Sequence, residues 1–271
     1  MSPAAQPRSG SPVAAAPTTA DGYAPFRSDG HGTRADVGVL LCHGFPGAPG
    51  SLRDWAEHLA AQGYQVRLPL LPGHGTHWSD ANRTGFDDWL GAVTAELQDL
   101  TVRCGSVVVA GLSMGGTLTL RLAELYPTAM AGIVVVNPSV TTLRKDAKLL
   151  PLLRWVLPAY PGIVGSIAKP GVVEPGYRVI PVRAMYSLSR AWPVVRADLP
   201  RIVAPTLVLH SRIDPIVEPV NSQIVLDGVG ATDTTSVVLE NSRHVATMDY
   251  DADLIFTTAD AFIERVTAVS S

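Results

Sequence analysis

The short segment at 111–116 limits the possible folds of this chain more than any other part of the sequence. It reads Gly-Leu-Ser-Met-Gly-Gly and joins an apolar run at 106–110 to a Leu-rich stretch at 114–126. A G-x-S-x-G pattern between a buried strand and a helix is typical of a nucleophile elbow, a strained turn that holds its serine above a parallel sheet. A glycine-rich turn with an ordinary serine is the alternative. The context favours the elbow, with Ser113 as the nucleophile.

Short apolar runs alternate with amphipathic stretches along most of the chain. We expect strands at 36–42, 64–69, 106–110, 132–136, 205–210 and 235–239, and helices at 51–63, 86–100, 114–126, 219–227 and 251–267. Strands that are apolar throughout are buried on both faces, so this alternation predicts an α/β fold with a mostly parallel central sheet flanked by helices. The core is expected to comprise residues 21–140 and 201–271.

Composition excludes several classes of protein. The chain has 271 residues and a formal charge of −3, which suits one large domain and argues against a nucleic-acid partner. Cys42 and Cys104 are too few for a disulfide framework and are expected to be buried thiols. No run approaches the ~18 apolar residues of a membrane span. Residues 1–20 lack the apolar core of a signal peptide, so we expect a disordered tail and a cytoplasmic protein.

The segment 141–200 interrupts the alternation and is expected to form a small lid. It holds eight of the 22 prolines, so its helices are expected to be short and broken. An insertion of this size between two strands is more typical of a functional lid than of a connection. It carries nine basic residues against three acidic ones. This excess fits either a solvated outer face or a weak association with anionic lipid interfaces.

A serine hydroxyl becomes a good nucleophile only when a base removes its proton and an acid orients that base. In this class of fold the acid and the histidine follow the serine, on loops beyond the ends of later strands. Asp214 lies in the loop after the expected strand at 205–210, and His244 lies in the loop after the one at 235–239. Asp227 and Asp233 are alternatives for the acid. The order along the chain predicts a catalytic triad of Ser113, Asp214 and His244.

The tetrahedral intermediate needs backbone N–H donors for its oxyanion. One is expected from Met114, the residue after the serine, and the other from the loop that follows the strand at 36–42. In this loop Phe45 is the candidate, because Pro46 has no N–H group. His43 precedes the serine and has no evident acid partner, so we interpret it as a residue that shapes the loop.

Metal binding is the other chemistry that this sequence raises. His74, His77 and Asp80 have spacings that metal ligands could have, but they lie in a Gly-containing loop, and nothing else indicates metal chemistry. Hydrogen bonds that shape the loop explain them better. We therefore expect no metal and no cofactor.

Five motifs together resemble those of bacterial carboxylesterases and monoacylglycerol lipases of the α/β-hydrolase superfamily. They are HGFPG at 43–47, LPGHGT at 71–76, GLSMGG at 111–116, SRIDPIV at 211–217 and SRHV at 242–245. The resemblance covers about residues 22–268 and includes a lid between the sixth and seventh strands of the family's sheet. It implies a serine ester hydrolase in which the three residues named above form the triad and Phe45 and Met114 donate to the oxyanion.

A carboxylesterase is therefore the expected function. His244 would deprotonate Ser113, and water would then hydrolyse the acyl-enzyme. An apolar lid that bears aromatic residues indicates a small hydrophobic ester with a short- to medium-chain acyl group, and monoacylglycerols are a subset of such esters. Thioesterases and acyltransferases use the same triad and are alternatives. A non-catalytic binding protein of this fold would be expected to have lost a triad residue, and here all three are present.

Overall fold

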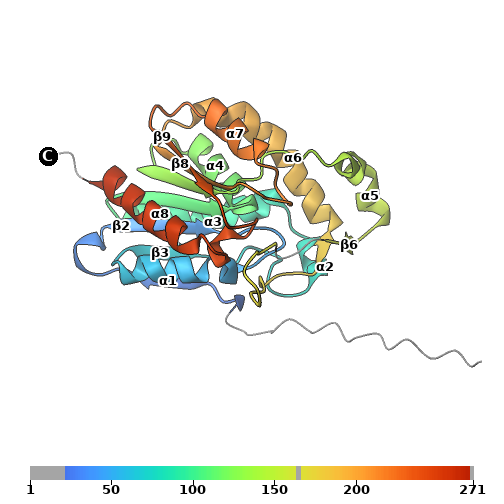
Figure 1. The fold of residues 1–271 in the computed structure, drawn as a ribbon, viewed down its shortest axis with the longest axis horizontal. Helices are drawn as coiled ribbons and strands as arrows, with labels where there is room; N and C mark the ends of the chain where they lie inside the picture. The colour runs from blue at the N-terminus through green and yellow to red at the C-terminus, as the bar shows by residue number, and fades with distance from the viewer. Residues whose placement is uncertain (1–21, 163–165, 269–271) are drawn as a thin grey trace, which may run out of the picture.

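A single sheet organises the molecule (Figure 1). The structure, a computed structural model, describes residues 22–162 and 166–268, and the tail expected at 1–20 lies outside the described residues. Within them, seven strands form the main sheet in the order β1-β3-β2-β4-β5-β8-β9. They are β1 (Phe26–Asp29), β2 (Val37–Cys42), β3 (Gln65–Leu68), β4 (Ser106–Leu112), β5 (Gly132–Val136), β8 (Thr206–Ser211) and β9 (Thr234–Leu239). Only β1 pairs antiparallel with its neighbour, which confirms the mostly parallel sheet.

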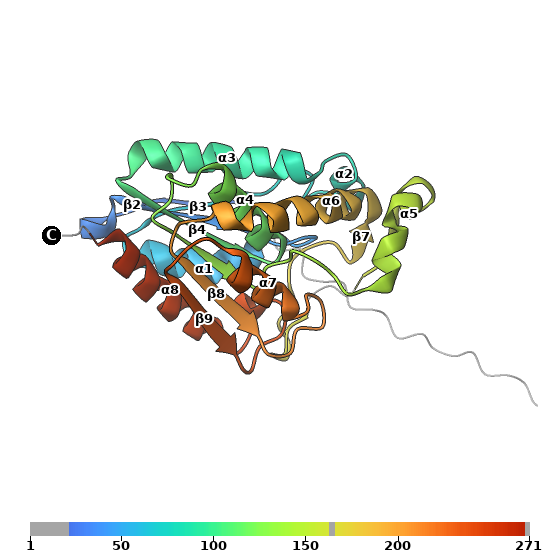
Figure 2. The ribbon, with the colours of Figure 1, turned by 90° about the horizontal axis from the view of Figure 1, so that it is seen from above.

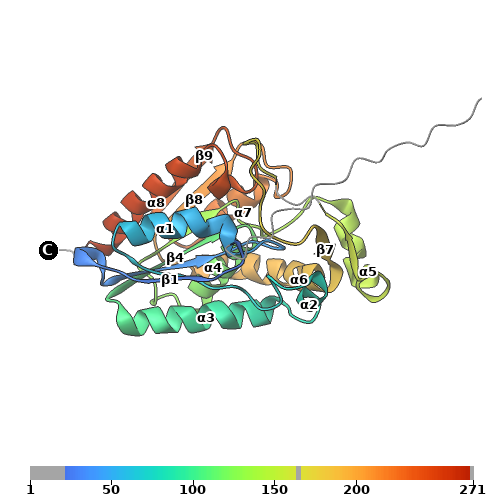
Figure 3. The same ribbon diagram turned by 90° about the horizontal axis from the view of Figure 1, so that it is seen from below.

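Helices cover both faces of the sheet. They are α1 (Arg53–Ala61), α2 (Trp78–Ala81), α3 (Phe86–Arg103), α4 (Met114–Leu125), α5 (Leu150–Val156), α6 (Val182–Asp198), α7 (Val220–Gly228) and α8 (Ala252–Thr267). Short 3₁₀ helices lie at η2 (Gly32–Arg34), η3 (Pro49–Leu52), η4 (Lys145–Leu149), η5 (Leu199–Arg201) and η6 (Ala246–Met248). Figure 3 shows α1 and α8 on one face and α3 on the other.

The residues of β4 show how the two layers of the core are built. Successive side chains of a strand point to opposite faces of the sheet. Val107 and Val109 therefore pack in one buried cluster with α3, α4 and α6, whereas Val108 and Ala110 pack in another with α1 and α8. Because both faces are covered, the strand is apolar along its whole length. This is the pattern that predicted it.

The length of α6 contradicts the expectation that the helices of 141–200 are short and broken. It runs for 17 residues with Pro193 in its interior. An interior proline costs about 3 kcal/mol because it removes an N–H donor and crowds the preceding turn. One face of α6 offsets this cost by packing into the core, through Ala184, Leu188, Trp192 and Val195. Figure 2 shows α6 lying between α3 and α7.

The helix α5 and the small sheet beside it lie at one end of the molecule (Figures 1 and 2). This small sheet consists of two antiparallel strands, β6 (Ala159–Pro161) and β7 (Val179–Pro181). Pro151 lies in the first turn of α5, where a helix tolerates proline because the N–H group there has no intrahelical acceptor.

The state of the cysteines and the character of the helices bear on two expectations from the sequence. Cys42 and Cys104 are buried free thiols, as predicted. Among residues 22–162 and 166–268, no helix combines the length and the apolar character that crossing a membrane requires.

Candidate active site

Ser113 lies in the sharp turn between β4 and α4. Its backbone has φ 57° and ψ −117°, a strained conformation for a residue with a side chain. Two glycines make the turn possible. A Cβ atom on Gly115 would lie 1.8 Å from the carbonyl oxygen of Cys42, and one on Gly111 would lie 2.2 Å from the carbonyl oxygen of Gly115. The predicted elbow is therefore present, and only glycine fits at these two positions.

The structure brings Ser113, His244 and Asp214 into one hydrogen-bonded chain. Nε2 of His244 lies 2.9 Å from Oγ of Ser113, and Nδ1 of His244 lies 2.7 Å from Oδ2 of Asp214. The three residues follow β4, β9 and β8, whose carboxyl ends meet at one edge of the sheet. All three are buried. In this arrangement His244 can accept the hydroxyl proton while Asp214 holds its ring.

Asp214 is fixed from both sides. Its Oδ1 accepts hydrogen bonds from the backbone N–H groups of Ile216, at 2.8 Å, and Val217, at 3.0 Å, which leaves Oδ2 for His244. The two alternative acids point elsewhere. Asp227 accepts a hydrogen bond from Gln223 on its own helix, and Asp233 pairs with Arg265.

Asn137 is a residue of this site that the sequence reasoning missed. It follows β5 directly and has a positive φ of 45°. Its Oδ1 accepts from the backbone N–H of Ser211 at 2.8 Å, and its Nδ2 donates to the carbonyl oxygen of His244 at 2.8 Å. Asn137 thus ties the ends of β5 and β8 to the histidine loop. The available signal was a polar residue directly after an apolar strand next to the elbow.

Phe45 and Met114 adjoin Ser113, and all three line one cavity. Met114 is the first residue of α4, where N–H groups have no acceptor within the helix. Within the described part of the chain, no group accepts a hydrogen bond from the backbone N–H of either Phe45 or Met114. Both N–H groups are therefore available to an oxygen atom bound beside Ser113.

His43 shapes the loop that carries Phe45. It is fully buried, its Nδ1 donates to the carbonyl oxygen of Gly44 at 2.9 Å, and its Nε2 accepts from the backbone N–H of Leu71 at 3.2 Å. Burial, together with nearby His74, lowers the pKa of His43 to about 3. The ring is therefore neutral at physiological pH, as both hydrogen bonds require.

The three residues considered as metal ligands serve separate purposes. His74 packs against the rings of Phe45 and Trp89, and burial lowers its pKa to about 4. His77 bonds to Ser79 through Nδ1, and Asp80 accepts from Thr76. Over 22–162 and 166–268, no group of three or more His, Cys, Asp or Glu side chains is placed to hold a metal ion.

Two cavities open onto Ser113. The larger has a volume of about 410 Å³. The insertion lines it with the large apolar and aromatic side chains of Tyr160, Ile180, Met185, Leu188 and Trp192, together with Thr141, Thr142 and Arg144. The smaller, of about 20 Å³, is bordered by His244 and by two polar side chains, Ser166 and Glu174. Ser113 thus lies between a larger and a smaller compartment, and both have apolar and polar side chains in their walls.

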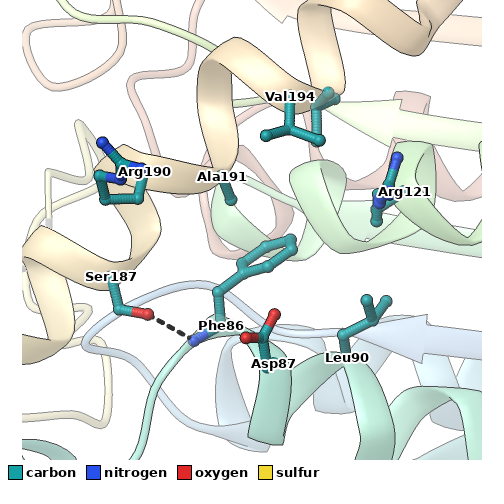
Figure 4. A pocket seen from close by; sticks show the side chains of 9 residues that line it. Phe86, Asp87, Leu90, Arg121, Ser187, Arg190, Ala191 and Val194 are labelled. Carbon is teal, nitrogen blue, oxygen red and sulfur yellow. Dashed lines mark hydrogen bonds between the residues drawn. The ribbon is translucent and has the colours of Figure 1, made fainter.

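A separate hollow of about 290 Å³ lies between α3, α4 and α6 (Figure 4). None of the three hydrogen-bonded residues lines it. The backbone N–H of Phe86 donates to Oγ of Ser187 across this hollow at 2.9 Å, which fastens α6 to the start of α3. This half of the insertion is therefore anchored to the core.

Comparison with known proteins gives consistent results. A model of the alpha/beta hydrolase family matches residues 39–256. A thermostable monoacylglycerol lipase from Bacillus sp. (strain H-257) is 43% identical over 230 residues, which cover 84% of this chain and 91% of that protein. A carboxylesterase from Bacillus subtilis (strain 168) is 26% identical over 235 residues, covering 85% and 94%. A solved structure from work on LipS and LipT, two metagenome-derived lipolytic enzymes, superposes with a TM-score of 0.86 at 37% identity, covering 90% of this chain and 98% of that one.

Proposed function

The chain belongs to the alpha/beta hydrolase family, and from this premise we propose that it is a serine ester hydrolase that acts on monoacylglycerols. The observation that carries the proposal is the hydrogen-bonded chain of Asp214, His244 and Ser113 at the junction of the two cavities. The named relatives in this family are lipases and esterases, which supports cleavage of an ester.

We assign each residue a step in acyl transfer. His244 takes the proton of Ser113 through Nε2 while Oγ attacks the ester carbonyl carbon. The backbone N–H groups of Phe45 and Met114 stabilise the oxyanion that forms. His244 then protonates the departing alcohol, and afterwards activates the water that hydrolyses the acyl-enzyme. Asp214 keeps Nδ1 of His244 protonated and stabilises the imidazolium.

The two cavities support a substrate with an apolar acyl group and a small polar alcohol. Because His244 protonates the departing alcohol, the cavity that His244 borders lies on the alcohol side. Ser166 and Glu174 border that cavity and could meet the hydroxyl groups of an alcohol such as glycerol. Its volume of about 20 Å³ holds about one water molecule, so a glyceryl group requires its wall to move outward. The larger cavity is mainly apolar and has the size of a small-molecule site, which suits a short- to medium-chain acyl group.

The part of the insertion that stands away from the core presents an apolar surface. Its exposed large side chains are Leu143, Leu149, Leu152, Trp155, Val156 and Leu157. Lys145 and Lys148, in the adjacent η4, add positive charge beside them. We propose that α5 and the β6–β7 sheet act as the lid and that this surface rests on anionic lipid, from which substrate enters the larger cavity.

A series of esters tests the proposed substrate. Each 1-monoacylglycerol, from acetyl to palmitoyl, is compared with the methyl ester and the coenzyme A thioester of the same acid. We expect kcat/KM to be highest for a short- to medium-chain monoacylglycerol, with Ser113→Ala as the inactive control. A consistent preference for methyl esters or for thioesters would contradict the proposed substrate while leaving a serine hydrolase in place.

A further inference from the structure

Asp249 lies between η6 and α8 and is almost fully buried. Its carboxylate accepts hydrogen bonds from four backbone N–H groups. Oδ2 accepts from Ala168 at 2.6 Å and from Arg243 at 2.9 Å, and Oδ1 accepts from Lys169 at 2.9 Å and from Tyr250 at 2.9 Å. Two of these donors belong to the 141–200 insertion, and Arg243 directly precedes His244. One carboxylate therefore joins the insertion to the histidine loop.

The stretch at 166–169, here called the strap, is tied to the histidine loop on both sides of His244. Asp249 links it to Arg243, and the carbonyl oxygen of Ser166 accepts from the backbone N–H of Val245 at 3.1 Å. Ser166 and Val245 also border the smaller cavity, next to His244. The wall on the alcohol side and the base that protonates the alcohol are thus held in one hydrogen-bonded unit.

The chemistry at Asp249 requires a carboxylate. Each of its two oxygens receives two N–H groups, and charge-assisted hydrogen bonds of this kind are stronger than neutral ones. The four backbone N–H groups stabilise the charge of Asp249, and within the described residues no arginine, lysine or histidine side chain forms an ion pair with it. An asparagine has only one carbonyl oxygen, so its NH₂ group would face two of the four N–H donors. Each carboxylate oxygen accepts from one strap residue, Ala168 or Lys169, and the strap would therefore lose one of these two hydrogen bonds.

We propose that Asp249 is a positioning residue that holds the strap against the histidine loop and thereby determines how well the enzyme discriminates between leaving alcohols. This inference rests on the proposed ester hydrolysis. Asp249 itself does not contact the substrate. Its effect acts through Ser166 and the wall of the smaller cavity.

Asp251 offers a matched control two residues further along. It too is a buried carboxylate that accepts from backbone N–H groups, those of Asn241 and Ser242, both at 2.8 Å. These contacts stay within the loop that leads to His244 and do not reach the strap. A change at Asp251 therefore disturbs the histidine loop without releasing the strap.

The test compares Asp249→Asn, Asp251→Asn and the wild type on a 1-monoacylglycerol and on the methyl ester of the same acid. For Asp249→Asn we expect kcat/KM to fall about tenfold more for the monoacylglycerol than for the methyl ester, mostly through KM. For Asp251→Asn we expect both values to fall by the same factor. An unchanged ratio in Asp249→Asn would overturn the inference.

A second variant covers the case in which Asp249→Asn does not fold. Ala168→Pro removes one of the strap's N–H donors and leaves the carboxylate in place. It should shift the ratio between the two esters in the same direction, and an unchanged ratio would overturn the inference. A wild-type enzyme that cleaves neither ester would instead overturn the proposed function, and this inference with it.

Discussion

Nδ1 of His244 lies 2.7 Å from Oδ2 of Asp214, although the two residues come from loops after different strands. The carboxylate fixes the tautomer in which Nε2 is free to accept the proton of Ser113. Asp214→Asn should lower kcat about 10³–10⁴-fold with little change in KM, because an amide can favour the wrong tautomer. Steady-state kinetics on p-nitrophenyl butyrate measures this. Asp227→Asn is the control and should leave kcat unchanged. A large loss of kcat in Asp227→Asn, with Asp214→Asn unaffected, would make Asp227 the catalytic acid instead.

The elbow could be predicted because its signals are local. The glycines around Ser113 and the apolar strand before it are adjacent in the sequence, and chain order then indicated Asp214 and His244. Asn137 and Asp249 could not be predicted in this way. Asn137 and Asp249 bond to backbone groups of segments far away in the sequence. In the sequence alone, the two residues look like ordinary turn residues.

The missed elements have a similar explanation. β1 reads Phe-Arg-Ser-Asp, which has no apolar run, and it exists because the edge of β3 supplies its hydrogen bonds. α6 continues through Pro193 because burial of one face outweighs the local cost. In both cases tertiary contacts override local preference, which a reading of single segments does not capture.

Gly115→Ala tests the close approach that the elbow requires. The added Cβ would meet the carbonyl oxygen of Cys42, which belongs to the backbone of β2 and cannot easily move. We expect the free energy of unfolding to fall by about 3 kcal/mol or more. Gly91→Ala is the matched control, since a Cβ on this exposed helical residue meets nothing within 4 Å. It should stabilise by about 0.5–1 kcal/mol.

Urea denaturation followed by circular dichroism compares the two glycine variants. A Gly115→Ala protein as stable as the wild type would show that the turn is looser than the structure indicates. Gly91→Ala should not alter kcat, because Gly91 lies in α3, away from the cavities that border Ser113.

Acid should destabilise the fold through two buried histidines. Burial lowers the pKa of His43 to about 3 and that of His74 to about 4, against a usual value of about 6.5. Below pH ~6.5 the unfolded chain therefore binds protons that the folded protein does not. The two neutral histidines contribute their full stability above this pH. As the pH falls toward 4, the free energy of unfolding decreases by at most about 1.4 kcal/mol per pH unit for each histidine.

Urea titrations over this pH range measure the effect. His74→Phe keeps a ring against Phe45 and Trp89 but removes one titrating group. The slope of the free energy of unfolding against pH should then decrease by the contribution of about one proton, which is at most about 1.4 kcal/mol per pH unit. An unchanged slope would mean that other groups govern the acid sensitivity.

The exposed apolar surface of the lid should bind anionic vesicles. Trp155→Ser should weaken binding at every salt concentration, whereas Lys145→Glu with Lys148→Glu should weaken it mainly at low salt, since salt screens exposed charges. Sedimentation with phosphatidylglycerol and phosphatidylcholine vesicles measures this. Val102→Ser changes an exposed apolar residue of α3 and serves as control. No binding, or equal binding to neutral vesicles, would contradict the proposed surface.

The reactivity of one hydroxyl distinguishes an active esterase from an inert protein of the same fold. A fluorophosphonate reacts with a serine only when a neighbouring base activates it, so we expect one equivalent to attach to Ser113, located by mass spectrometry of the digested protein. Ser113→Ala should abolish the labelling and lower the hydrolysis of p-nitrophenyl butyrate about 10⁴-fold or more. Attachment to a different residue, or substantial turnover by folded Ser113→Ala, would contradict the assignment of the nucleophile.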